Sequence, residues 1–215
     1  MIADDLQRIR RDFKDRATAL RNREQYDRAI DTLEKALHEL RSLTPEGVAE
    51  ERALRAEMAD TYGIKGGVYR RAGDNAHALE QYRFGAKHED EDRVSTYNIA
   101  NVITLEITSE RRSPAHPDVQ AKLARVIEQL EADTRGARQD EWWAWFDLGQ
   151  AYLLSGRLPE AQRCYERGVS TGARGSDVER HVQILEELRD ATAETSPTTS
   201  RDIEAAIAVL RTHID

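Results

Sequence analysis

The sequence predicts an all-α protein, and three of its features lead to this prediction. Apolar residues recur at intervals of three and four, which places them along one face of a helix. One such stripe consists of Ile30, Leu33, Leu37 and Leu40. Runs of Val, Ile and Thr with the strict alternation of a β-strand do not occur. Proline falls between the helical stretches rather than inside them, and the breaks divide the chain into about ten helices.

Residues that cap or interrupt helices mark the expected boundaries in chain order. A side-chain oxygen before the first turn can accept from backbone N–H groups, and proline fits the first helical position. Glycine often ends a helix because it adopts a left-handed backbone without steric cost. The boundaries predicted in this way are Thr44-Pro45, Gly73-Asp74, Ser113-Pro114, His116-Pro117, Gly156 with Pro159, and a capping box from Ser176 to Glu179.

Composition and charge restrict the classes of partner. The 215-residue chain contains 40 acidic and 32 basic residues, and its net charge of −8 makes nucleic-acid binding unfavourable. Cys164 is the only cysteine, so no disulfide can form within the chain, and a reducing compartment is expected. No apolar run approaches the roughly 18 residues that a membrane-spanning helix needs, and the first residues lack a secretory signal. We therefore predict a cytoplasmic protein without membrane contact.

A pattern of aromatic, apolar and small residues recurs along the chain. Residues 145–152 read Trp-x-x-Leu-Gly-x-x-Tyr, and Ala161 and Tyr165 follow. Residues 62–69 give a second copy, Tyr-x-x-Lys-Gly-x-x-Tyr, with Ala and Tyr at the same later offsets. This spacing is that of the tetratricopeptide repeat, and the chain resembles that family.

The resemblance implies a right-handed superhelix of stacked antiparallel helix pairs, because one pair cannot bury its own apolar face. Weaker copies begin at Phe13 and Tyr97, which gives about four pairs plus flanking helices. The spacing is irregular, since only the step between the second and third copies approaches the family period of about 34 residues. Small residues such as Gly66 and Gly149 are expected to let the facing helix of each pair approach.

Residues 55–190 are also similar to the helical TRAF-binding region of some MAP kinase kinase kinases and to its bacterial relatives. The segments that carry this similarity are GGVYRRAGDNAHALEQYRFGA, STYNIANVITL and EWWAWFDLGQAYLLSGRLPEAQRCYERGV. The similarity implies a signalling scaffold that regulates a partner enzyme or receptor.

The repeats are expected to form one helical domain over residues 1–191, followed by a polar hinge, TAETSPTTS, at residues 192–200. Residues 201–215 are expected to form a final amphipathic helix. Its apolar stripe consists of Ile203, Ile207, Leu210 and Ile214. This helix either caps the last repeat or docks into the groove of the superhelix.

The aromatic cluster WWAWFDLGQAY at residues 142–152 cannot face one way, because a helix turns by about 100° per residue. The packing positions of the repeat are held by Trp145, Leu148 and Tyr152. A different stripe holds Trp143, Phe146 and Gln150. That stripe should face the concave groove and contact a partner, or its aromatic residues instead cover the helix predicted over residues 117–134.

The same offsets predict groove positions in the earlier copies. These positions hold Asn98, Asp60, Arg70, Lys14 and Arg21. Asn98 could hydrogen-bond the backbone of an extended peptide, although these polar residues also fit an ordinary solvated face. Asn101 lies where the repeat expects a small apolar residue, so its carboxamide needs hydrogen-bond partners.

No catalytic or metal-binding arrangement emerges from the sequence. The six histidines lack the spacing of metal ligands, phosphate-binding glycine loops are absent, and Cys164 is expected to fill the core. The predicted function is a non-catalytic interaction scaffold that needs no cofactor and binds a partner peptide or helix in its groove. The other prediction is a sensor for a small molecule or peptide, with the C-terminal helix as a displaceable plug.

Overall fold

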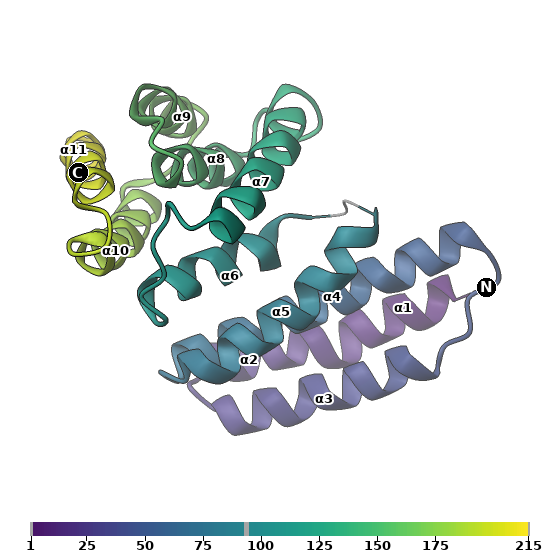
Figure 1. Ribbon diagram of the computed structural model, residues 1–215. Coiled ribbons are helices and arrows are strands. Elements are labelled where there is room, and N and C mark those ends of the chain that lie inside the picture. Colours follow the sequence, from purple (N-terminus) through teal and green to yellow (C-terminus); the bar gives the residue numbers. More distant parts are fainter. Residues whose placement is uncertain (1, 93–94, 215) are drawn as a thin grey trace. The chain divides into compact units, whose positions relative to one another are not determined.

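The computed structural model describes the backbone of residues 2–92 and 95–214 and the side chains of residues 2–89 and 95–214. All regular secondary structure in these residues is helical, which confirms the all-α prediction. The elements in chain order are α1 Ala3–Ile9, the π-helical turn η1 Arg10–Asp15, α2 Arg16–Asn22, α3 Tyr26–Ser42, α4 Val48–Arg71, α5 Asn75–Asp92, α6 Tyr97–Thr108, α7 Pro117–Arg135, α8 Trp142–Leu154, α9 Leu158–Ser170, α10 Gly175–Thr192 and α11 Pro197–Arg211 (Figure 1). Within the described part of the chain, no helix is both long and apolar enough to cross a bilayer.

The chain divides into two compact units, Met1–Val102 and Ile103–Asp215. The division falls within α6, whose first half belongs to unit 1 and whose second half belongs to unit 2. Each unit is built from helices that pack against their neighbours in sequence.

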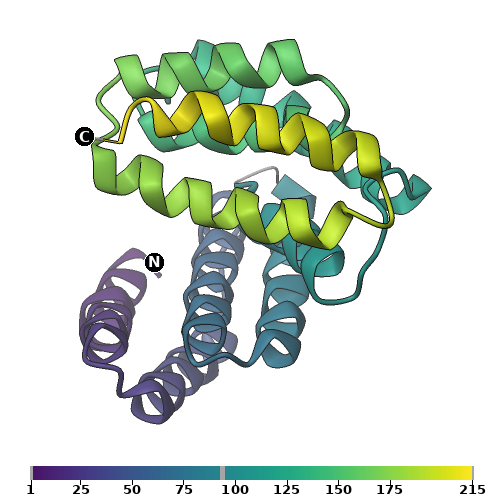
Figure 2. The same cartoon turned by 90° about the vertical axis from the view of Figure 1, so that its left-hand side faces the viewer.

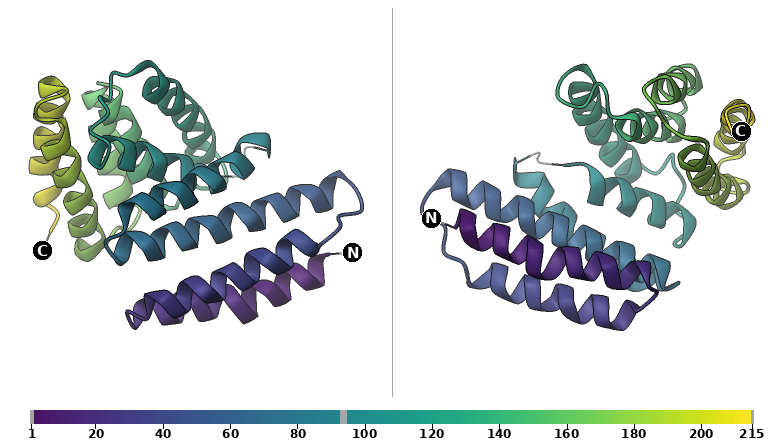
Figure 3. Two further views of the ribbon diagram at one scale, coloured as in Figure 1. Left: turned by 60° about the horizontal axis from the view of Figure 1, so that its bottom comes forward. Right: turned by 180° about the vertical axis from the view of Figure 1, so that it is seen from behind.

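In unit 1, α1, η1 and α2 follow one another without a break and form one rod beside α3 and α4 (Figure 3). One apolar cluster joins Ile9, Ala36, Leu37, Leu40 and Tyr62. A second cluster joins Ala17, Leu20, Ala29, Leu33 and Val68. Because each cluster takes residues from the rod, α3 and α4, the three elements share one core, and α5 then packs along α4.

Close approach within the helix pairs depends on glycine. A Cβ atom at Gly66 of α4 would lie 2.7 Å from Cε1 of the Tyr82 ring on α5. A Cβ atom at Gly149 of α8 would lie 2.7 Å from Cε1 of Tyr165 on α9. Both rings are 1% exposed, so each fills the notch that its glycine leaves. The two predicted close approaches are therefore present.

In unit 2, α7 packs on α8, α8 pairs with α9, and α10 pairs with α11 (Figure 2). The last two helices were expected only as flanking elements, but they run side by side as a further helix pair. The stripe of α11 is buried through Ile203, Ile207 and Leu210, while Ile214 lies beyond the end of the helix. Since α11 also contacts α8 and α9, its apolar face completes the core of unit 2.

Several predicted boundaries are confirmed. Pro117 is the first residue of α7, and Pro159 lies in the first turn of α9. Asp74 caps α5, because its Oδ1 accepts from the backbone N–H of His77 at 3.1 Å.

The start of α4 differs from the prediction. The helix begins at Val48 rather than at Pro45, and Gly47 before it has a φ of +115°, which glycine adopts without strain. The carboxylate of Glu50 accepts from the backbone N–H of Glu46 at 2.8 Å and so satisfies the backbone ahead of the helix.

The last two helices also begin earlier than expected. α10 begins at Gly175, and Asp177 rather than Glu179 reaches back, accepting from the backbone N–H of Arg174 at 3.2 Å. α11 begins at Pro197, inside the segment expected as a hinge. The hydroxyls of Ser196 and Thr199 hydrogen-bond at 2.8 Å across its first turn, which the polar composition alone did not indicate.

Neighbouring glycines on α4 give a direct test of the notch. Gly66→Ala should lower the free energy of unfolding by roughly 1–3 kcal/mol, because the buried Tyr82 ring cannot move away. Gly67→Ala is the control, since its Cβ would meet only ordinary contacts at 3.7 and 3.9 Å and alanine favours helix by up to about 1 kcal/mol. Urea unfolding of both variants measures the difference, and equal effects would contradict the notch.

The packing of α11 predicts that its stripe supports stability. Ile207→Ala should cost about 2–5 kcal/mol of unfolding free energy, since the side chain is fully buried. Arg201→Ala on the exposed side of the same helix should change stability by less than about 0.5 kcal/mol. If α11 were instead a displaceable plug, Ile207→Ala should leave the free energy of unfolding in chemical denaturation unchanged.

Candidate functional site

Helix α8 carries the aromatic cluster of the chain, and the structure separates its residues onto several faces. Trp143 is 36% exposed at the first turn of the helix. Its indole Nε1 donates to Glu141 Oε2 at 2.9 Å, and the guanidinium of Arg138 lies 5.1 Å from the ring centroid. Arg138 in turn pairs with Asp133 at 3.0 Å. The ring is therefore held in one place while part of it remains open to solvent.

Gln150 lies two turns further along α8 and is half-buried. Its Nε2 donates to the hydroxyl of Thr104 at 3.0 Å, which ties α8 to the part of α6 within unit 2. The contact fixes the orientation of the carboxamide on the same side of the helix as Trp143.

Phe146 is not exposed, which corrects the expectation that it lies open in a groove. Its side chain is 1% exposed, and its ring centroid lies 5.7 Å from that of Tyr165 on α9 and 4.9 Å from that of His181 on α10. The cause is Gly168, where a Cβ atom would lie 2.4 Å from the Phe146 ring. The ring fills this notch, so it joins α8 to α9 and α10 rather than covering α7.

Asn98 is also buried, at 1% exposure, and this corrects its expected place in a groove. Its Nδ2 donates to the backbone carbonyl of Ala59 at 2.9 Å and to Glu89 Oε1 at 3.0 Å. The Glu89 carboxylate also accepts from the backbone N–H groups of Asn98 and Ile99, at 2.9 and 3.2 Å. Asn98 therefore connects α4, α5 and the start of α6 in unit 1, where Gly85 leaves the space that it fills.

Arg70 is half-buried on α4, and its Nη1 donates to Asn101 Oδ1 at 3.5 Å. The Nδ2 of Asn101 donates to the carbonyl of Tyr97 at 2.8 Å. These two contacts supply the partners that the Asn101 carboxamide was expected to need.

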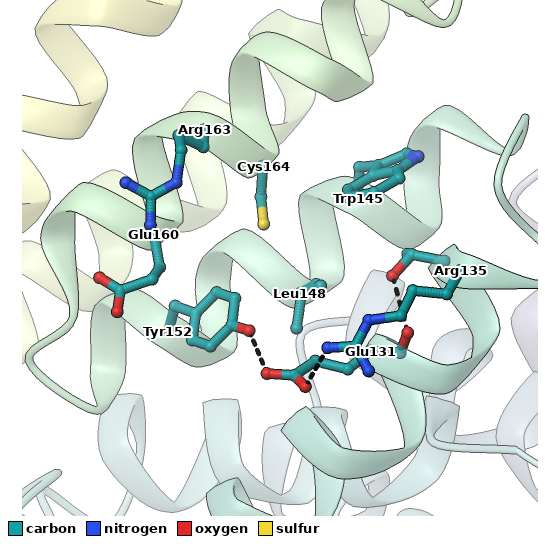
Figure 4. A pocket seen from close by; sticks show the side chains of 9 residues that line it. Glu131, Arg135, Trp145, Leu148, Tyr152, Glu160, Arg163 and Cys164 are labelled. Atoms are coloured by element: carbon teal, nitrogen blue, oxygen red, sulfur yellow. Dashed lines mark hydrogen bonds and ion pairs between the residues drawn. The ribbon is translucent and has the colours of Figure 1, made fainter.

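Unit 2 has a cleft of about 200 Å³ between α7, α8 and α9 (Figure 4). It is lined by Glu131, Thr134, Arg135, Trp145, Leu148, Tyr152, Glu160, Arg163 and Cys164. Trp145 is only half-buried here, although its position in the repeat predicted core packing. Its Nε1 donates to the carbonyl of Gln139 at 2.9 Å, which keeps the indole on the rim of the cleft.

Three polar residues of this cleft, Glu131, Arg135 and Tyr152, are joined by hydrogen bonds. Glu131 accepts from the hydroxyl of Tyr152 and from Arg135 at 2.6 Å. These hydrogen bonds lower the pKa of Glu131, so its carboxylate stays ionised and is a poor general acid. Burial raises the pKa of the Cys164 thiol to about 12, which keeps it protonated and unreactive as a nucleophile.

Buried polar atoms surround Phe146. His181 Nε2 and the Tyr165 hydroxyl have no hydrogen-bond partner within the described part of the chain. Burial lowers the pKa of His181 to about 4, so its ring is neutral near pH 7. Burial raises the pKa of Asp147 to about 7, and the nearby charge of Arg138 only partly offsets this. The sequence alone did not distinguish His181 or Asp147 from an ordinary residue of a helix surface.

Comparison with known proteins identifies the helix pair that carries the aromatic cluster. Residues 144–171, which cover most of α8 and all of α9, match the family model described as a tetratricopeptide repeat. No curated protein matches the sequence. Among solved structures, the chain is similar to a kinesin light chain from Podospora anserina described as having nearly identical tetratricopeptide-like repeats. That similarity has 16% identity, covers 96% of each chain and has a TM-score of 0.41. The family match places one tetratricopeptide repeat on α8 and α9.

The buried imidazole of His181 predicts a specific loss of stability in acid. The unfolded chain binds its proton near pH 6.5 and the folded protein only near pH 4, so the unfolded state holds more protons between these values. Stability should therefore fall as the pH drops from about 6.5 to 4, by up to about 3 kcal/mol from this residue. His181→Phe should remove this component in urea titrations at pH 7 and 4.5.

His38→Gln is the matched control for this prediction, because His38 is exposed. Asp147 acts in the opposite sense, since its raised pKa lowers the stability of the folded state as the pH rises. Its effect is present in wild type, His181→Phe and His38→Gln alike, so it cancels in the comparison. If the free energy of unfolding falls by the same amount between pH 7 and 4.5 in wild type and in His181→Phe, His181 is not the source of the loss.

Proposed function

We propose that this protein is a non-catalytic interaction scaffold that binds a segment of a partner protein along α8, next to Trp143. The observation that carries the proposal is the partly exposed indole of Trp143, held in place by Glu141 and Arg138. Large aromatic side chains of this kind are frequent anchors at protein interfaces. An anchor that is already ordered loses little conformational entropy when a partner binds.

The fold supports the same class of function. The α8–α9 pair is a tetratricopeptide repeat, and such repeats generally mediate protein–protein interaction through extended surfaces. Trp143 and Gln150 are seven residues apart, which corresponds to about 10 Å along a helix. An extended partner segment covers that length with about three residues. We therefore assign one side-chain contact to Trp143 and one polar contact to Gln150.

Two residues that sequence offsets favoured are left out of the direct contact. Phe146 and Asn98 are each 1% exposed and serve the cores of their units. The cleft between α7, α8 and α9 lies on another face of α8 and is a weaker candidate, because its Glu131 carboxylate already accepts from Tyr152 and Arg135. Regulation of a partner signalling enzyme, and a place in the cytoplasm, stay predictions that follow from the sequence similarity. The sensor alternative has less support, since α11 is packed as the second helix of a pair.

The proposal is tested by quantitative affinity capture from lysate of the native source, followed by titration of the captured partner against purified variants. Trp143→Ala should weaken binding by about tenfold or more, as is typical for loss of an aromatic anchor. Phe84→Ala is the matched control, because Phe84 is 40% exposed but lies in unit 1. Equal affinity of wild type and Trp143→Ala for every captured partner would refute the assignment. Phe146→Ala is unsuitable as a test variant, since it removes a core ring.

A further inference from the structure

We propose that unit 1 carries a second surface, formed by Arg21, Arg70, Arg71 and Tyr97, that binds a phosphorylated serine or threonine in a segment of a partner protein. The four residues are called the arginine surface. The proposal goes beyond the function assigned to α8, because it concerns other helices and a ligand of defined chemistry. The partner contact at Trp143 and the arginine surface are independent, so either proposal can fail while the other holds.

Packing brings the three arginines to the same end of unit 1. Leu20 of α2 and Val68 of α4 belong to one buried cluster, so these helices meet at that level. Arg21 follows Leu20 directly, and Arg70 and Arg71 follow Val68 at the end of α4. The pKa of Arg21 is lowered, first by burial of its guanidinium and next by the positive charge of Arg71. The guanidiniums of Arg21 and Arg71 are therefore close enough to repel one another.

Two tyrosine hydroxyls lie beside the arginines. Gly67 stands one turn before Arg70 and Arg71, and a Cβ atom there would lie 3.7 Å from the hydroxyl of Tyr82 and 3.9 Å from that of Tyr97. Tyr97 is 50% exposed, so part of its ring is open to solvent at this place. Arg70 reaches further to Asn101 at 3.5 Å. The surface thus combines cationic groups with hydroxyl and carboxamide groups.

Carboxylates neutralise arginines at many other places in this acidic chain. In unit 1, Arg8 pairs with Glu39 at 2.7 Å and Arg10 pairs with Glu57 at 2.7 Å. By contrast, Arg21 bonds only the carboxamide of Asn22, at 3.3 and 3.4 Å, among the described side chains. Arg71 is exposed and forms no ion pair with any of these side chains. Among the side chains that the structure describes, the guanidiniums of Arg21 and Arg71 therefore have no carboxylate partner although the net charge is −8, and an anion from another molecule would supply one.

A phosphate monoester fits this arrangement better than a single carboxylate. A carboxylate is satisfied by one bidentate guanidinium, whereas a phosphorylated side chain carries about −1.5 to −2 charges and three strong acceptor oxygens. It can therefore engage guanidiniums from α2 and α4 together. Nucleic acid presents phosphates as well, but its extended backbone would also meet the acidic surface of the chain, which the net charge of −8 makes unfavourable.

The test uses a fluorescein-labelled pool of peptides with a central phosphoserine flanked by degenerate positions, and matched pools with serine or glutamate at the centre. Fluorescence anisotropy with the full chain should detect binding of the phosphoserine pool. Arg21→Ala/Arg71→Ala should raise the apparent Kd about tenfold or more, because two charge-assisted contacts are lost. Arg16→Ala/Arg28→Ala removes the same charge from exposed positions on α2 and α3 and should leave the Kd within about twofold.

Each other outcome overturns the proposal. Absence of binding to the phosphoserine pool, or an equal loss in the control pair, excludes the arginine surface as the site. Equal binding of the glutamate or serine pool excludes recognition of the phosphate, and equal competition by a single-stranded oligonucleotide excludes preference for a protein segment. Arg71→Ala alone, at an exposed position, should weaken binding without altering the helical circular dichroism, which separates loss of the site from loss of the fold.

Discussion

The contact on which the helix packing depends is an aromatic ring seated against a glycine of the facing helix. Tyr82 lies over Gly66 in unit 1, and Tyr165 lies over Gly149 in unit 2. At these places a ring replaces the missing side chain, so two helices approach closely and still bury a large apolar area. The same contact recurs between Phe146 and Gly168, where it brings α10 against the α8–α9 pair through the ring of His181.

This constraint decides which aromatic residues remain for a partner. Phe146 fills the notch at Gly168 and is part of the core, whereas a ring that no facing helix covers stays at the surface. Trp143 is of the second kind, since it is held by Glu141 and Arg138 rather than by a facing helix. Helical periodicity places Trp143 and Phe146 on one stripe, but it does not reveal that Gly168 lies opposite only one of them. The division between core and binding surface therefore depends on contacts that are distant in sequence.

Features that depend on local spacing could be predicted from the sequence, whereas contacts between distant residues could not. The helices and the close approaches at Gly66 and Gly149 follow from spacing within the chain, because apolar periodicity and small residues are local features. The burial of Asn98 was not predictable in this way, since it requires Gly85 and Glu89 of α5 together with a carbonyl of α4. The cleft between α7, α8 and α9 was equally hidden, because these three helices form it together and the repeat pattern covers only α8 and α9. The similarity to the TRAF-binding region stays a prediction, because the family match covers only residues 144–171.

Two cations of the first helical rod, Lys14 and Arg21, were expected in the groove, and their electrostatic surroundings differ. Lys14 is 4% exposed and pairs at 2.5 Å with Glu57, which also accepts from Arg10 at 2.7 Å. Burial alone would raise the pKa of Glu57, but the hydrogen bonds from Arg10 and Lys14 outweigh it and the pKa is lowered. The π-helical turn η1 contains both cations, four residues apart, and both reach the same carboxylate. A buried charge needs such partners, so Lys14 is committed to the core. Arg21, near the other end of the rod, lies close to Arg71 of α4 and has no carboxylate partner among the described side chains, which is why we propose it as a site for an anion from outside.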